Sequence, residues 1–323
     1  MVNVKESGPI PFDYTFGPIR MQFHTFLQNV DGWGPDGVEI EYDPAEVVLP
    51  ADIAAYKGKI IAEKEADAKA KGKVFFDGQQ VRMKDYGHRV ANKETEELKL
   101  YLKFGPGSYF THACTGQIVD KKMLKDENGK DVSIREKYIK DHYSWDDCLG
   151  NSVGVSTAII SRPDHALVYV KRSDKITQYP GRFGVAAAGF MDRKKDLMDN
   201  VPNPFKTMQR ETTEEMGVET QFGDFKITGI GRPWDDLHGE LWGVTKTDKT
   251  VAQIRGSPKK QKYESLAMLD VPFEPRSVLP ILKDAGNTWV NAHAVATIDA
   301  LLQEYKTDEV LAIAEQLKAE GLL

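Results

Sequence analysis

The chain has 323 residues, of which 41% are hydrophobic and 28% charged, an ordinary composition for a globular protein. Its formal net charge of -6 at pH 7 argues against a general affinity for the nucleic acid backbone or for an anionic membrane surface. The two cysteines, Cys114 and Cys148, have neither CxxC nor CxxH spacing, so we expect neither a zinc ribbon nor a disulfide framework.

The start of the chain indicates an intracellular protein. Residues 1–20 contain no apolar core flanked by basic residues, so we do not expect a signal peptide. No apolar run approaches the roughly 20 residues that a membrane span needs. We therefore expect a cytoplasmic protein that has neither nucleic acid nor a membrane as a partner.

Residues 1–149 are predicted to form a smaller, β-rich N-terminal domain with one helix. The helix is expected over residues 50–73, where Ile53, Tyr56 and Ile60 follow helical spacing. Apolar residues then alternate along residues 97–104, which predicts a strand. We expect this strand to break at residues 105–107, Gly-Pro-Gly.

Residues 150–323 have a different pattern and are predicted to form a second domain. Two apolar runs around a Pro-Asp turn, within residues 154–173, indicate a β-hairpin. A glycine-rich loop at residues 179–190 and a linker lead to a helix that begins near Pro204. Further strands and C-terminal helices follow, so the predicted fold class is α/β (α+β).

The helix after Pro204 carries an unusual group of carboxylates. Asn203 is a good N-cap before a proline at the first helical position. One stripe of this helix is apolar, and an adjacent face presents Glu211, Glu214 and Glu215. Like charges three and four residues apart repel, so this face is either a solvated acidic surface or a site for cations.

The sequence of residues 210–218, R-E-T-T-E-E-M-G-V, resembles the second half of the Nudix box. Thr212 stands where that family has an aliphatic residue. Gly189 matches the family's loop glycine but lies about seven residues too far from Arg210, and Pro202 replaces the family's glutamate. We therefore predict an insertion in the glycine loop at residues 192–202, with loss of the glutamate that steadies the arginine.

Residues 75–275 are similar to a Nudix subgroup with a long N-terminal region, which includes the mammalian Nudix protein that cleaves UDP-glucose and UDP-galactose. The resemblance implies a Nudix α/β/α sandwich with a mixed sheet, preceded by the N-terminal domain. It also implies metal-dependent hydrolysis of a nucleoside diphosphate sugar to a nucleoside monophosphate and a sugar phosphate. The alternatives are ADP-ribose, a dinucleotide or a nucleoside triphosphate as substrate, or a non-catalytic domain that binds a nucleotide or a protein.

The resemblance further implies the residues that bind metal and act in catalysis. Glu211, Glu214, Glu215 and the carbonyl of Gly189 resemble the family's ligands for Mg²⁺ (or Mn²⁺), hard cations that prefer oxygen. Glu214 and Glu215 are the expected catalytic carboxylates. Glu264 resembles a late-loop glutamate that serves many members as ligand or general base; the alternative is a surface charge at a strand edge.

Candidate substrate-binding residues lie in the predicted loops. Arg182 and Arg232 each follow a glycine and could supply positive charge to a diphosphate, although each could also be an ordinary surface arginine. Tyr179 and Trp234 are candidates for stacking on a base, with a core position as the alternative. His112, His238 and His293 show no metal-ligand spacing, so we expect each to be a hydrogen-bonded or an exposed histidine. The partner is predicted to be a small-molecule nucleotide, and the N-terminal domain either completes its pocket or forms a homodimer interface.

Overall fold

The computed structural model describes residues 14–72, 75–92, 94, 97–141, 145–176, 178–258 and 265–323. Its central element is a mixed sheet of eight described strands. Six follow in spatial order: β11 (Phe183–Val185), β10 (Ala166–Arg172), β9 (Val153–Ser161), β16 (Gly239–Thr247), β15 (Phe225–Pro233) and β3 (Phe23–Trp33). In addition, β12 (Ala187–Phe190) pairs with β9, and β17 (Ser265–Pro272) pairs with β10. Only the β9–β16 pair among these is parallel.

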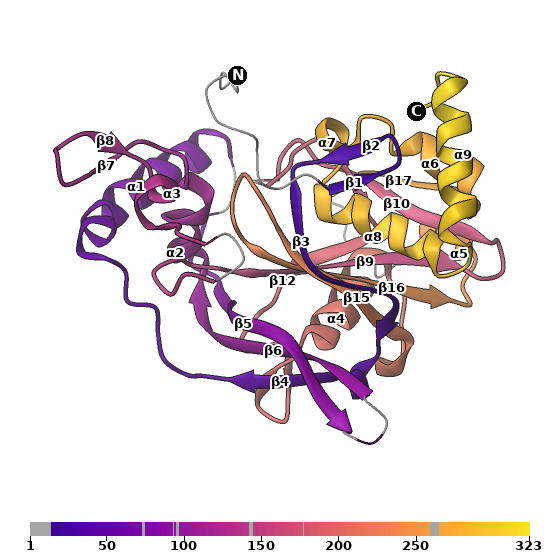
Figure 1. The fold of residues 1–323 in the computed structure, drawn as a ribbon, viewed down its shortest axis with the longest axis horizontal. Helices are drawn as coiled ribbons and strands as arrows, with labels where there is room; N and C mark the ends of the chain where they lie inside the picture. The colour runs from indigo at the N-terminus through magenta and orange to yellow at the C-terminus, as the bar shows by residue number, and fades with distance from the viewer. Residues whose placement is uncertain are drawn as a thin grey trace.

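Helices cover both faces of this sheet (Figure 1). Because side chains alternate along a strand, Val153 and Val155 of β9 pack with α4 (Pro204–Met216), whereas Ala158 and Ile160 pack with α8 (Asn291–Leu302). The remaining described helices of this region are α5 (Val251–Arg255), α6 (Pro275–Ile281), α7 (Ala285–Thr288) and α9 (Thr307–Ala319). The predicted class, an α/β/α sandwich with a mixed sheet, is confirmed.

The β-rich first region supplies a second, three-stranded sheet in the order β4-β6-β5. Figure 1 shows α1, α2 and α3 gathered at one end of the molecule, beyond this sheet. The bounds are β1 (Tyr14–Phe16), β2 (Ile19–Met21), β4 (Val38–Tyr42), α1 (Ala51–Ala70), β5 (Gln79–Asn92), β6 (Glu97–Ser108), α2 (Tyr109–Ala113), β7 (Leu124–Lys125), β8 (Asp131–Val132) and α3 (Ile134–Tyr138). Three short 3₁₀ turns are described as well: η1 (Pro35–Gly37), η2 (Gly116–Ile118) and η3 (Phe222–Asp224).

The two predicted regions are joined within one sheet. Strand β3 comes from the first region, yet it pairs with β15 and forms an edge of the eight-stranded sheet. Val81 and Met83 of β5 belong to the same buried cluster as Val153 and Leu241 of the large sheet. The division of the chain near residue 150 therefore stays a prediction about domains, and the regions share a core.

Strand β6 continues through the Gly-Pro-Gly segment, where the sequence predicted a break. Pro106 lies opposite Val81 of β5, whose N–H donates to the carbonyl of Met191 instead of to β6. The neighbouring strand β4 ends opposite Phe104. The proline nitrogen thus occupies a place in the sheet where no hydrogen-bond donor is needed.

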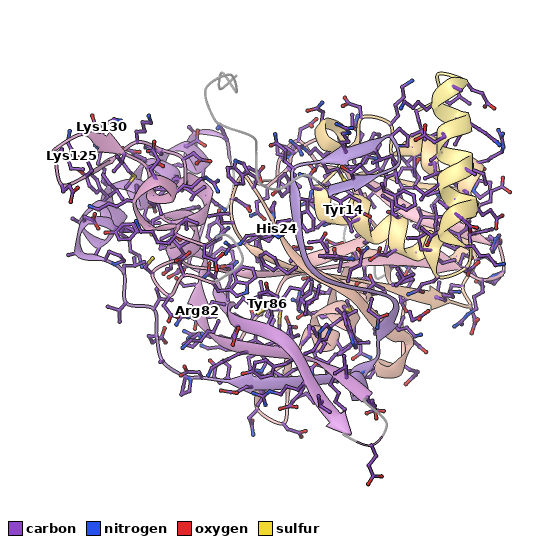
Figure 2. All side chains as sticks on the ribbon, viewed as in Figure 1. Tyr14, His24, Arg82, Tyr86, Lys125 and Lys130 are labelled. Carbon is purple, nitrogen blue, oxygen red and sulfur yellow. The ribbon has the colours of Figure 1, made fainter. Side chains whose placement is uncertain are left out.

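A buried carboxylate, Asp299 of α8, connects that helix to two strands of the sheet. Its Oδ1 accepts a hydrogen bond from Gln28 of β3 at 2.5 Å, and its Oδ2 accepts one from the indole of Trp242 of β16 at 2.6 Å. Tyr14, whose place beside α8 is seen in Figure 2, lies close enough for the charge of Asp299 to raise its pKa further, beyond the effect of burial. Asp299 therefore helps to hold the edge strand β3 to the rest of the sandwich.

None of the helices in the described part of the chain is long and apolar enough to cross a membrane.

We expect Asp299 to make stability depend on pH. Burial raises its pKa from 3.8 to about 6, so between these values the folded protein binds the proton more tightly than the unfolded chain does. This contribution is complete below pH 4 and is lost as the pH rises through 6. Relative to Asp299→Asn, the wild-type free energy of unfolding should fall by up to about 3 kcal/mol between pH 4 and pH 7, measured by urea denaturation. Parallel pH profiles for the two proteins would contradict this.

Candidate active site

Helix α4 places its carboxylates through local signals at both ends. The side chain of Asn203 accepts a hydrogen bond from the N–H of Phe205 at 3.0 Å, Pro204 takes the first helical position, and Gly217 ends the helix with φ of 63°. Phe205 and Met208 are buried against the sheet. The orientation of the helix is thereby set, and the adjacent face is turned towards β12.

Two of the three carboxylates on that face contact β12. A Cβ atom added to Gly189 would lie 1.9 Å from Oε1 of Glu211, so the carboxylate takes up the space that a side chain would fill. Glu215 accepts a hydrogen bond from the N–H of Ala188 at 3.2 Å. Glu214 lies further out, with 41% of its side chain exposed. The predicted ligands on α4 and the predicted loop glycine are thus brought together at one place.

The arginine of this helix has a carboxylate partner in the preceding loop. Asp196, between β12 and α4, accepts two hydrogen bonds from Arg210, at 2.7 Å from Nε and at 2.9 Å from the second guanidinium nitrogen. Asp196 is buried and also accepts from the hydroxyl of Thr207 at 2.9 Å. Pro202 therefore does not leave the arginine without support, because Asp196 supplies the missing carboxylate.

Arg210 in turn fixes the carboxylates around it. It donates to Glu211 Oε1 at 2.6 Å, and it lies 3.4 Å from Glu214 Oε2. Burial would lower the pKa of Arg210, but the hydrogen bonds and charges of Asp196 and Glu211 outweigh it and raise that pKa. Arg210 also donates a hydrogen bond to the carbonyl of Phe190 at 3.2 Å. The pair Asp196–Arg210 thus joins the loop, the helix and β12.

The donor set at this place fits a divalent cation. Glu211, Glu214 and Glu215 offer carboxylate oxygens, and Gly189 offers a backbone carbonyl on the strand beside them. Mg²⁺ and Mn²⁺ prefer such hard oxygen ligands. Arg210 offsets only part of the negative charge of three carboxylates on one helix face, so a bound cation would relieve their repulsion.

A cavity of about 710 Å³ opens beside this cluster, and Gly189 and Glu211 form part of its wall. Its volume lies within the range of about 300–1,000 Å³ that small-molecule sites occupy. Both regions of the chain line it. The first region contributes Lys71, Phe75, Phe76, Gln80 and Tyr109, and the second contributes Arg172, Lys175, Tyr179, Phe190, His238, Glu240 and His293.

The predicted substrate-binding residues lie in different surroundings. Tyr179 lines the cavity, and its hydroxyl is 3.2 Å from Asp235. Arg182 is outside the described lining; it donates to the carbonyl of Trp289 at 3.1 Å and lies 5.4 Å above the ring of Tyr179. Trp234 is covered by Arg135, whose guanidinium is 3.8 Å from the ring.

Arg232 has the position of a core side chain. It is fully buried, and its guanidinium lies 4.2 Å above the ring of Trp145 and 5.8 Å from that of Phe26. Burial lowers the pKa of Arg232 to about 10, although the negative charge of Asp146 acts to raise it. It is not among the described residues that line the cavity, so its role in binding a diphosphate stays a prediction. Glu264 lies outside the described residues.

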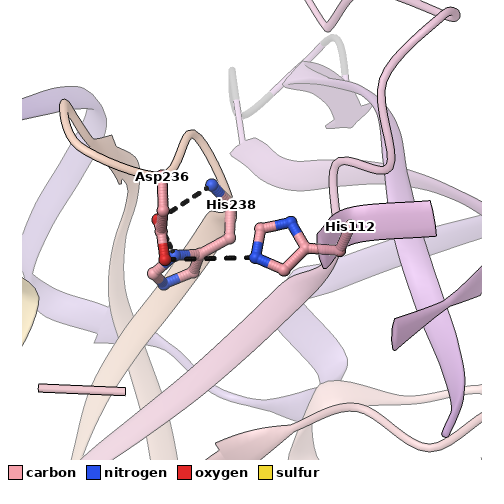
Figure 3. Close-up of side chains that lie close together, drawn as sticks. All are labelled: His112, Asp236 and His238. Carbon is pink, nitrogen blue, oxygen red and sulfur yellow. Dashed lines mark hydrogen bonds and ion pairs between the residues drawn. The ribbon is translucent and has the colours of Figure 1, made fainter. Parts of the chain in front are cut away.

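A histidine cluster at the cavity was not expected from the sequence. Asp236 and His238 lie just before β16, and His112 of α2 points towards them (Figure 3). The spacing of these histidines in the sequence did not indicate this grouping, because His112 is distant from His238 along the chain. One signal was present: Asp236, His238 and Glu240 alternate, and alternate residues of a strand share a face.

Their protonation states differ because their neighbours differ. Burial alone would lower the pKa of His238, but Asp236 at 2.5 Å and Glu240 at 2.9 Å raise it to about 10. Burial lowers the pKa of His112 to about 4. At neutral pH, His238 is therefore a cation between two carboxylates, and His112 is a neutral imidazole.

No family model matches the chain, and no curated protein matches it. Among solved structures, it is similar to DR0079 from Deinococcus radiodurans, with 15% identity, a TM-score of 0.34, and coverage of 54% of this chain and 95% of that one. It is also similar to the Nudix domain of NrtR from Shewanella oneidensis, solved with ADP ribose, with 13% identity, a TM-score of 0.34, and coverage of 47% of this chain and 88% of that one. A third similar structure is the dihydroneopterin triphosphate pyrophosphohydrolase of E. coli, with 12% identity, a TM-score of 0.32, and coverage of 46% of this chain and 94% of that one.

Loss of Asp196 should destabilise the protein strongly. Asp196→Ala leaves Arg210, whose side chain is only 19% exposed, without both of its hydrogen bonds to Asp196. Breaking a buried pair in this way costs about 3–5 kcal/mol in the free energy of unfolding, which denaturant titration measures.

The matched control removes a surface ion pair of similar length. Asp248 lies 2.9 Å from Arg162, and both side chains are at least half exposed. Asp248→Ala should therefore cost at most about 1 kcal/mol. Equal losses for the two variants would show that the Asp196–Arg210 pair has no special part in stability.

Proposed function

We propose that this chain is a metal-dependent hydrolase of the Nudix type. The observation that carries the proposal is the cluster of Glu211, Glu214 and Glu215 beside Gly189, at the wall of a cavity of about 710 Å³. The proposed reaction cleaves the diphosphate of a nucleoside diphosphate sugar and gives a nucleoside monophosphate and a sugar phosphate. The arrangement Asp196–Arg210–Glu211 supports this reading, because it preserves an anchored arginine next to the carboxylates despite the altered box.

The proposed roles follow from the positions of the side chains. Glu211, Glu214, Glu215 and the carbonyl of Gly189 would hold Mg²⁺ or Mn²⁺, which when bound neutralises a diphosphate and polarises its phosphorus. Arg210 keeps Glu211 against β12 and so orients one ligand oxygen. A carboxylate of Glu214, Glu215 or Glu264 would accept the proton of the attacking water as general base.

The lining of the cavity supports a nucleotide as the substrate. Lys71, Arg172 and Lys175 provide positive charge that suits phosphate groups. Phe75, Phe76 and Tyr109 belong to the first region, and Tyr179 faces the same cavity from the second region. Aromatic faces stack on any nucleobase, so we propose that both regions form the nucleoside pocket. A cytoplasmic location, the lack of a nucleic acid partner and a homodimer remain parts of the proposal.

Product analysis tests this function directly. The full chain would be incubated with Mg²⁺ or Mn²⁺ and with UDP-sugars, ADP-ribose, diadenosine polyphosphates, NADH or nucleoside triphosphates, and the products separated by chromatography. We expect UMP and a sugar phosphate, with the rate reduced at least about 100-fold in the double variant Glu214→Gln, Glu215→Gln. Glu219→Gln, the same change at an exposed position just beyond the helix, should leave the rate unchanged.

Other outcomes change the proposal in defined ways. AMP from ADP-ribose would keep the mechanism and replace the substrate. Absence of turnover on every compound with either metal would leave a domain that binds a nucleotide or a protein without cleaving it.

Gly189→Ala should weaken the binding of Mg²⁺ to the carboxylate cluster. The new Cβ would lie 1.9 Å from Glu211 Oε1 and 2.4 Å from its carboxyl carbon, so the carboxylate must move away from β12. We expect the increase in melting temperature caused by Mg²⁺ to shrink, and turnover to need more Mg²⁺. Gly223→Ala is the control, because nothing lies within 4 Å of its new Cβ. An unchanged dependence on Mg²⁺ in Gly189→Ala would argue against a metal site at Glu211.

A further inference from the structure

A buried cluster of His112, Asp236 and His238 joins the two regions of the chain. His112 is in α2 of the first region, whereas the other two lie between β15 and the start of β16. Each residue offers one potential ligand atom, and these atoms all lie within 4.8 Å of one another. Figure 3 shows the imidazole of His112 directed at the carboxylate of Asp236. None of the three belongs to the carboxylate cluster on α4.

The imidazole of His112 lacks a hydrogen-bond partner among the described residues. It is fully buried, and in the described structure neither ring nitrogen has a hydrogen bond. Such a group normally costs free energy unless something satisfies it. Its Nε2 lies 3.9 Å from Asp236 Oδ2, which is too long for a hydrogen bond. Two ligands of one tetrahedral zinc ion, with bonds of about 2.0–2.1 Å, lie about 3.3 Å apart, so a small movement would let both bind an ion.

His238 is oriented as a metal-binding histidine usually is. Its Nε2 is 2.9 Å from Glu240 Oε2, and its Nδ1 faces Asp236. In metal sites, a carboxylate that accepts from one ring nitrogen fixes the other nitrogen as the ligand. His238 Nδ1 lies 2.5 Å from Asp236 Oδ1, so one metal ion could contact both groups. Any proton on Nδ1 would be released to solvent when the ion binds.

The backbone around the cluster leaves room for close contacts. A Cβ on Gly116 would lie 2.2 Å from the carbonyl oxygen of Asp236 and 2.8 Å from the ring of His112. A Cβ on Gly154 would lie 2.1 Å from Glu240 Oε2. Glycine at these two positions allows the side chains to pack against the backbone. The charges also favour a cation, since the carboxylates of Asp236 and Glu240 lie 2.5 and 2.9 Å from the two ring nitrogens of His238.

We propose that His112 Nε2, Asp236 Oδ2 and His238 Nδ1 bind a transition-metal ion of the zinc class. Two imidazoles and one carboxylate suit Zn²⁺ or Co²⁺ better than Mg²⁺, which prefers oxygen ligands only. This site is distinct from the oxygen-ligand cluster on α4. Because His112 comes from the first region and His238 lines the cavity, the ion would fasten the first region to the cavity wall.

The test is a titration of the full chain, stripped of metal by a chelator, with Co²⁺ and Zn²⁺ in the presence of excess Mg²⁺. The Mg²⁺ occupies oxygen-only sites. We expect one Co²⁺ to bind with the intense visible absorption of a tetrahedral site, and one equivalent of Zn²⁺ to displace it. Zn²⁺ should also raise the melting temperature.

The affinities of single variants for Zn²⁺ test whether these residues bind the ion. His112→Ala should lower the affinity for Zn²⁺ about 100-fold or more, and Glu240→Gln about 10- to 100-fold, as expected for a residue that only orients a ligand. His165→Ala removes an exposed histidine and should bind as the wild type does. Glu211→Gln should also keep the Co²⁺ spectrum, which separates this proposal from the proposed hydrolase.

Two results would overturn the proposal. One is a wild-type protein that binds no Zn²⁺ tightly, or binds Co²⁺ only with the weak absorption of an octahedral oxygen site. The other is a folded His112→Ala, judged by circular dichroism, whose affinity for Zn²⁺ equals that of the wild type. If His112→Ala does not fold, His112→Gln takes its place in the same comparison.

Discussion

The buried ion pair between Asp196 and Arg210 is the contact on which the arrangement of the candidate active site depends. Arg210 bonds to Asp196 through two nitrogens, to Glu211 through a third contact and to the carbonyl of Phe190. One guanidinium therefore links the lengthened loop, the carboxylate helix and β12. A planar group with several fixed donors suits this task, which a lysine could not perform in the same way.

The same pair explains how a long loop is compatible with an ordered site. Residues between β12 and α4 form a small hairpin of β13 (Leu197–Met198) and β14 (Val201–Pro202). Asp196 lies at its base, where it also accepts from the N–H of Asp192 at 2.8 Å. The hairpin thus projects from an anchored base, and Gly189 and Glu211 lie side by side although they are far apart in the sequence.

Two groups of potential ligands meet at one cavity, and they have different chemistry. Glu211 brings oxygen ligands from α4, whereas His238 brings a nitrogen ligand from the residues just before β16. Residues of the first region, including Phe76 and Tyr109, line the same cavity. The first region is therefore part of the cavity wall and shares its hydrophobic core with the large sheet.

Local features of this protein were determined by the sequence itself. The cap at Asn203, the glycine at 217 and the face of Glu211, Glu214 and Glu215 all depend on neighbours within a few turns, so helical periodicity was enough to predict them. The alternation in β9, β10, β15 and β16 likewise led to the α/β class. Contacts between distant segments were decided only by the tertiary structure. Asp196 is the loop carboxylate that reaches Arg210, 14 positions further along the chain, His112 meets Asp236 from another region, and the Gly-Pro-Gly segment stays in β6 because of the strands beside it. Such contacts depend on the path of the chain in space, which residue spacing does not encode.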